Sequence, residues 1–80
     1  RFIEDYHSDD MIRVSTESSQ DCQVELIVFD IKGKILTKKT YHSQIGRNSI
    51  TLSTSGINRG AYFYSIIVND SVVRTNKFIK

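Results

Sequence analysis

The chain has 80 residues, of which 39% are hydrophobic and 25% are charged, and its formal net charge is +2. A chain of this length forms one domain that buries only roughly 60% of its unfolded surface, which leaves little room for an enclosed active site. The charge is close to the globular average and the basic residues are scattered, so we predict neither a nucleic-acid partner nor binding to an anionic membrane.

Two further features concern the chain as a whole. The single cysteine, Cys22, excludes an internal disulfide, and we expect it to be a small buried apolar residue. No run approaches the roughly 20 apolar residues that are needed to span a bilayer. Because the chain starts with Arg1 and not with methionine, we interpret it as a piece of a longer protein, in which case any targeting signal would lie upstream.

The first ten residues are rich in acidic side chains, and we predict an irregular N-terminal segment or linker over residues 1–10. Phe2 and Ile3 could nevertheless begin a strand. Alternation of apolar and polar side chains predicts a strand over Met11–Ser15. The β-sandwich domain itself is expected to span residues 11–80.

A hairpin is predicted next. The run Cys22–Asp30 alternates like a strand and is rich in β-branched and aromatic residues. Asp30-Ile31-Lys32-Gly33 has the composition of a type I turn, in which Asp30 caps backbone amides and Gly33 takes a positive φ. The return strand, from Lys34 to about His42, carries three lysines, which is typical of an edge strand protected against unwanted pairing.

A further strand and a crossing loop follow. Ile50 and Leu52 alternate with polar neighbours, which predicts a half-buried strand. The loop after it holds one apolar residue, Ile57, which we expect to plug the end of the core where the chain crosses between sheets. Gly60 then frees the backbone to enter the next strand.

The chain ends in a predicted terminal hairpin. Its strands are Gly60–Val68 and Ser71–Lys80. The connection Asn69-Asp70 suits a primed two-residue turn, because Asn and Asp tolerate left-handed backbone conformations.

Six or seven short strands, regular turn signals and the absence of proline predict an all-β fold, a small antiparallel immunoglobulin-like β-sandwich. Two strands, Val24–Phe29 and Tyr62–Val68, are apolar on both faces, which is more than one inner face requires. A bare apolar patch is unusual on a free monomer, so we expect a host domain, a receptor or a second copy to cover it. A dimer through the exposed apolar sheet face is therefore one prediction.

Short motifs occur in a fixed order along this sandwich. They are Val28-Phe29-Asp30, the turn Gly33-Lys34, the series Gly46, Asn48, Ile50 and Leu52, the pair Gly60 and Tyr62, and the ending Lys77-Phe78-Ile79-Lys80. Their order and spacing resemble the type A C-terminal sorting domain of type IX secretion system cargo proteins from the Bacteroidetes. The resemblance covers residues 9 to 80, but the chain lacks the proline-containing segment that usually precedes the first strand of family members.

The resemblance implies a sorting signal. A domain of this family directs an N-terminal cargo domain through an outer-membrane translocon, by way of the periplasm, to the outer membrane, the cell surface or the medium. A sortase-like peptidase at the surface commonly removes it. The family's signatures fall on six candidate partner-recognition residues: Gly60, Tyr62, Lys77, Phe78, Ile79 and Lys80.

These residues also have structural interpretations. Gly60 would permit a backbone conformation that other residues avoid. Tyr62 would anchor the core with its hydroxyl at the rim, and Lys77 and Lys80 would belong to a solvated strand end. In the recognition interpretation, a partner adds a strand beside the terminal one, with backbone hydrogen bonds for affinity and the lysines for register. The two interpretations are compatible.

The chain contains histidine, aspartate and cysteine, but their spacing matches no catalytic or metal-binding motif. His7, Asp9 and Asp10 lack an established metal-ligand spacing. Cys22 with either His7 or His42 lacks an orienting group and an oxyanion hole. The chain has no phosphate-binding glycine loop. We therefore predict a protein that is not an enzyme and that binds no metal or cofactor.

Two other functions are alternatives at this point. A fibronectin-like or carbohydrate-binding accessory module of a secreted surface protein would use Tyr41, Tyr62, Phe63 and Tyr64 as a platform, although the chain has no tryptophan. A structural spacer would lie inside its parent protein, whereas the sorting interpretation expects Lys80 to be the natural C-terminus.

Overall fold

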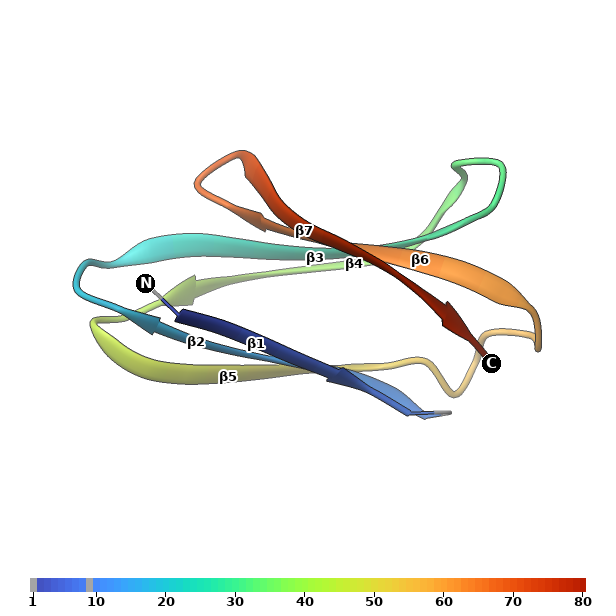
Figure 1. Ribbon diagram of the computed structural model, residues 1–80, viewed down its shortest axis with the longest axis horizontal. Coiled ribbons are helices and arrows are strands. Elements are labelled where there is room, and N and C mark those ends of the chain that lie inside the picture. Colours follow the sequence, from blue (N-terminus) through green and yellow to red (C-terminus); the bar gives the residue numbers. More distant parts are fainter. Residues whose placement is uncertain (1, 9) are drawn as a thin grey trace.

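Seven strands in two sheets make up the computed structural model, which describes residues 2–8 and 10–80. The strands are β1 (Phe2–His7), β2 (Met11–Ser18), β3 (Cys22–Asp30), β4 (Ile35–Ser43), β5 (Gly46–Ser53), β6 (Ala61–Val68) and β7 (Ser71–Ile79). One sheet has the order β1-β2-β5 and the other the order β4-β3-β6-β7, and all pairs are antiparallel. The sheets form the two layers of a sandwich (Figure 1), which confirms the predicted fold.

The first strand differs from the expectation for the N-terminal segment. Residues 2–7 pair with β2, from Phe2 opposite Glu17 to His7 opposite Ile12, so the prediction of an irregular segment over residues 1–10 is corrected for this part. The open edge of β2 supplies the backbone hydrogen-bond partners, which a local pattern of acidic residues does not reveal. Residues 1 and 9 lie outside the described chain, and a boundary at residue 10 between linker and domain stays a prediction.

The core lies between the two sheets and is built from side chains that alternate along the strands. Its buried hydrophobic residues are Ile12, Val14, Cys22, Val24, Leu26, Val28, Ile50, Leu52, Tyr64, Ile66, Val68 and Phe78. Ile57 packs against this cluster from the loop between β5 and β6, as expected for a plug. No helix among the described residues is long and apolar enough to cross a membrane.

The turn between β3 and β4 has the predicted chemistry. Gly33 donates its N–H to the carbonyl of Asp30 at 3.0 Å and has a φ of +88°. The Asp30 carboxylate accepts the N–H groups of Lys32 and Lys34, each at 2.9 Å. These hydrogen bonds lower the pKa of Asp30, with the one from Lys34 contributing most. The strand that follows, β4, lies at the edge of its sheet, as its lysines predicted.

Candidate recognition site in the terminal hairpin

The β6–β7 hairpin is closed by a turn of the predicted kind. Asn69 and Asp70 have φ values of +48° and +68°, so both central residues are left-handed, as a type I′ turn requires. Asn69 also ties the turn to β3, because its N–H reaches the carbonyl of Gln23 at 2.9 Å and its side-chain oxygen accepts the N–H of Gln23 at 3.0 Å. The hairpin is therefore fixed at its turn.

The other end of the hairpin is fixed as well. Gly60 and Lys80 exchange backbone hydrogen bonds, with N···O distances of 3.1 Å from Gly60 to Lys80 and 2.8 Å in the other direction. The ammonium group of Lys80 donates to the carbonyl of Thr54 in the crossing loop. Lys80 is thus a partly buried member of the fold, whereas its structural interpretation from the sequence was a solvated strand end.

Gly60 and Tyr62 form a local unit where the chain enters β6. The hydroxyl of Tyr62 donates to the backbone carbonyl of Asn58 at 2.6 Å. A tyrosine near the start of this strand that bonds back to the backbone a few residues upstream is the tyrosine corner of immunoglobulin-like sandwiches. The ring of Tyr62 lies over Gly60, whose φ of +157° L side chains rarely adopt. The Gly-x-Tyr signature therefore shapes the crossing between the two sheets.

The remaining candidate residues divide between the two faces of β7. Phe78 is 2% exposed, and its ring centroid lies 5.7 Å from that of Tyr62 and 5.9 Å from that of Tyr64. Its neighbours Lys77 and Ile79 point to the outer face, and Ile79 is 64% exposed. All six candidate residues thus gather at one end of the hairpin, and Lys77 and Ile79 are the two of them that are exposed.

A polar network that the sequence analysis missed joins β1 to the hairpin across the sandwich. The Asp5 carboxylate accepts hydrogen bonds from the hydroxyl of Tyr64, the guanidinium of Arg74 and, at 2.7 Å, the amide of Asn76. The Asp5 side chain is 7% exposed and that of Arg74 is 43% exposed, so this is a partly buried contact between the first strand and the last two. The network therefore ties the middle of the hairpin to β1.

The network shifts the acid–base equilibria of two of its members. Burial raises the pKa of Asp5, but the hydrogen bonds from Tyr64, Arg74 and Asn76 and the charge of Arg74 outweigh it, so the pKa lies below its ordinary value. Burial and the hydrogen bond to Asp5 raise the pKa of Tyr64 to about 12. At neutral pH the pair is therefore a carboxylate that accepts from a phenol.

Among the described residues, the side chains considered for chemistry do not assemble into a centre. Asp9 lies outside the described residues, and His7 packs near Tyr64 and Phe78 with ring centroids 6.1 and 5.7 Å away. The described residues contain no group of His, Cys, Asp and Glu side chains that could hold a metal ion. Cys22 is in the core, while His42 on the neighbouring strand is exposed and lies 3.3 Å from the carboxylate of Asp21.

The aromatic platform of the alternative binding module is not assembled on one surface. Tyr64 is fully buried, and Tyr41 and Tyr62 pack against the core. Only Phe63 points to the outer face of the sheet, because it alternates with Tyr64 along β6.

The chain is similar to one protein family and to part of a solved enzyme structure. A family model described as the secretion system C-terminal sorting domain matches residues 8–80. Among solved structures, a selenomethionine-labelled β-glucosidase from Kluyveromyces marxianus matches with a TM-score of 0.60 and 13% sequence identity, over 95% of this chain. The chain spans only 13% of that enzyme, and the low identity shows a shared fold alone. No curated protein sequence matches the chain.

Proposed function

Because the chain belongs to the family of secretion system C-terminal sorting domains, we propose that it directs an attached N-terminal cargo protein across the outer membrane through the type IX secretion system. The observation that carries the proposal is the family match over residues 8–80, nearly the whole chain. We infer a signal without catalytic activity, since the family is one of sorting signals. Its route leads from the periplasm to the cell surface or the medium.

The arrangement of the two chain ends supports this role. The start of β1 and the end of β7 lie at opposite ends of the long axis (Figure 1), which measures 37 Å. A cargo domain attached before β1 would therefore leave the end of the terminal hairpin accessible. We propose that the outer-membrane translocon recognises this end and that a sortase-like surface peptidase then separates the domain from its cargo.

Within the hairpin we propose a division of roles. Gly60, Tyr62 and Phe78 maintain the shape of its end, and Lys77 and Ile79 contact the partner. Because β7 is an edge strand, a partner strand can pair beside it through backbone hydrogen bonds, with the outward side chains fixing the register.

The function is tested by fusing the 80 residues to the C-terminus of a periplasmic reporter in a host that has the translocon. We expect the reporter at the surface or in the medium, and peptidase action would shorten the fusion by about the 9.2 kDa of this domain. Retention of the reporter in the periplasm, with the domain folded, would refute the proposal.

The role of the hairpin is tested with exposed residues, since a deletion of the last residues would remove the buried Phe78 and the fold with it. The variant Lys77→Glu/Ile79→Glu should abolish delivery. A matched control, Arg47→Glu/Ile45→Glu, changes the same residue classes at the other end of the sandwich and should deliver normally. Normal delivery of the Lys77→Glu/Ile79→Glu variant would show that the partner binds another surface.

A further inference from the structure

The outer face of the four-stranded sheet carries a pair of aromatic rings outside the core. Phe29 of β3 lies opposite Phe63 of β6, and their rings stack with centroids 5.6 Å apart and 16° between the planes. The neighbours Val28 and Tyr64 are fully buried, so alternation turns the two rings outward, where both are partly exposed. Together they form an apolar platform.

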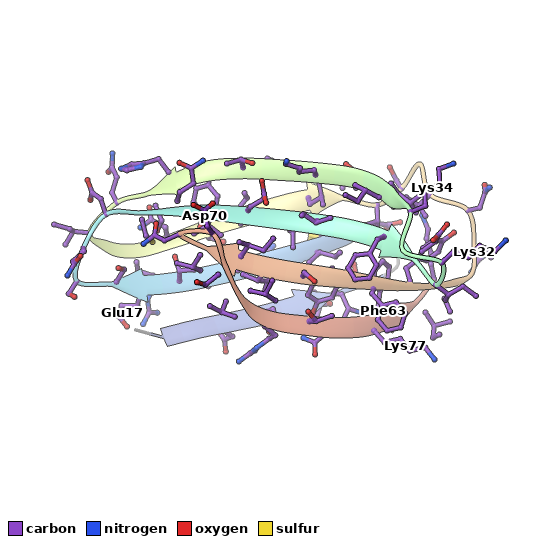
Figure 2. The ribbon with its side chains drawn as sticks, turned by 90° about the horizontal axis from the view of Figure 1, so that it is seen from above. Glu17, Lys32, Lys34, Phe63, Asp70 and Lys77 are labelled. Atoms are coloured by element: carbon purple, nitrogen blue, oxygen red, sulfur yellow. The ribbon has the colours of Figure 1, made fainter. Side chains whose placement is uncertain are left out.

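Lysines border this platform on two sides. Lys77 of β7 lies directly opposite Phe63 in the strand register. Lys32 and Lys34 belong to the turn that follows Phe29. Figure 2 shows Lys32, Lys34, Phe63 and Lys77 together at one end of the sheet. We call the two phenylalanines and these three lysines the Phe-Lys patch.

The positive charge of the Phe-Lys patch is only partly compensated within the described chain. None of its lysines forms a salt bridge to another described residue. The carboxylate of Asp30, in the same turn, accepts two backbone N–H groups and also interacts with the charges of Lys32 and Lys34, so one carboxylate stands against three lysines. Glu25, farther along the face, pairs with Lys38 at 3.2 Å. Glu17 and Asp70 lie at the other end of the molecule (Figure 2), so the patch forms a basic and apolar surface.

We infer that the Phe-Lys patch is a docking surface for an acidic segment of a protein partner. The partner places an aromatic or aliphatic side chain on the stacked rings and carboxylates beside the three lysines. Charge complementarity favours this partner over a second copy of the chain, which would bring lysines against lysines. The rings are half-buried and stacked on each other, whereas membrane-binding surfaces sink whole apolar side chains into the acyl boundary.

The inference rests on the geometry of this face and is independent of the route by which the protein is exported. Lys77 belongs both to the Phe-Lys patch and to the proposed hairpin contacts. Binding to the isolated 80-residue chain is measured without any translocon, so failure of the docking inference and failure of the secretion proposal are distinguishable.

The test is titration of the isotope-labelled 80-residue chain with an acetylated peptide of four glutamates around one tryptophan, followed by backbone amide shifts. We expect saturable shifts centred on Phe29, Phe63 and Lys77. Lys32→Glu/Lys77→Glu should weaken binding at least tenfold. The control Arg13→Glu/Arg47→Glu changes the net charge equally on the three-stranded sheet and should alter the affinity less than twofold. A peptide with serine in place of tryptophan should bind at least fivefold more weakly.

Several results would overturn the inference. No saturable shifts, or equal weakening by the two charge-reversed variants, would mean that the Phe-Lys patch has no specific affinity for acidic segments. Tighter binding to phosphatidylglycerol vesicles than to the peptide would identify a membrane surface instead. Concentration-dependent shifts of the patch without peptide would identify a second copy of the chain. The amide spectrum of each variant reports whether it is folded.

Discussion

Replacing Asp5 with alanine is expected to lower the free energy of unfolding by about 3 kcal/mol. The carboxylate is 7% exposed and accepts hydrogen bonds from Tyr64, Arg74 and Asn76. A hydrogen bond to a charged group contributes about 1.5–3 kcal/mol, and we take the lower value for each of the bonds from Tyr64 and Asn76. The Arg74 side chain is 43% exposed, so its ion pair adds only about 0–1 kcal/mol after solvent screening.

Thermal unfolding followed by circular dichroism measures this loss. A domain of this size has a total stability of about 4–12 kcal/mol. Since 1 kcal/mol corresponds to about 4–8 °C in a small domain, Asp5→Ala should lower Tm by at least about 12 °C. Asp5→Asn keeps the shape of the side chain and one acceptor oxygen, so its free energy of unfolding should fall by about half as much as that of Asp5→Ala. A loss below about 0.5 kcal/mol in Asp5→Ala, the size of an ordinary surface substitution, would refute the reasoning.

The pH dependence of the stability difference between the wild type and Asp5→Asn is a second test of the Asp5 contact. The folded-state pKa of Asp5 lies below its ordinary value, so the unfolded chain takes up the proton first as the pH falls. The stabilisation is complete above the ordinary pKa of about 4 and is lost as the pH drops through the lower folded-state pKa. The stability difference between the wild type and Asp5→Asn should therefore narrow below about pH 4. A constant difference would contradict the assignment.

Two matched pairs of substitutions test the packing around the hairpin and the core. Tyr41→Phe should raise the free energy of unfolding by about 1 kcal/mol, because the buried Tyr41 hydroxyl has no hydrogen-bond partner among the described residues. Tyr62→Phe should lower the free energy of unfolding by about 1 kcal/mol, since it removes the hydrogen bond to the Asn58 carbonyl. Urea denaturation measures both changes, and urea midpoints that shift in the same direction in the two variants would contradict this account. Gly60→Ala should cost about 1–3 kcal/mol because its φ is +157°, whereas Gly56→Ala has open space around the added carbon and should stay within about 0.5 kcal/mol. Equal midpoints for the two alanine variants would show that Gly60 is not conformationally required.

The parts of the fold that local chemistry specifies were predictable from the sequence. The Asp30–Gly33 turn has the predicted hydrogen bond and the predicted positive φ at Gly33. The Asn69-Asp70 turn has the predicted positive φ values at both residues. The alternation over Cys22–Asp30 predicted β3, and the run that follows Gly60 predicted β6. The edge position of β4 followed from its lysines. Each of these features depends on residues that are close together in the chain.

The parts that depend on distant contacts were not predictable in the same way. The partners of Asp5 are 59, 69 and 71 residues away in the sequence. The available signal was the alternation along β7, which places Arg74 and Asn76 on the same face as the buried Phe78 and so predicts a polar partner at the edge of the core. The contact of Lys80 with Thr54 is also non-local, because the two residues are 26 positions apart in the sequence.

The most direct test of the central claim compares a periplasmic reporter with and without these 80 residues, in strains with and without the type IX translocon. The fraction of reporter outside the outer membrane is measured in all four combinations. Our account predicts delivery only where both the domain and the translocon are present. Equal delivery of the fusion in the two strains would contradict it.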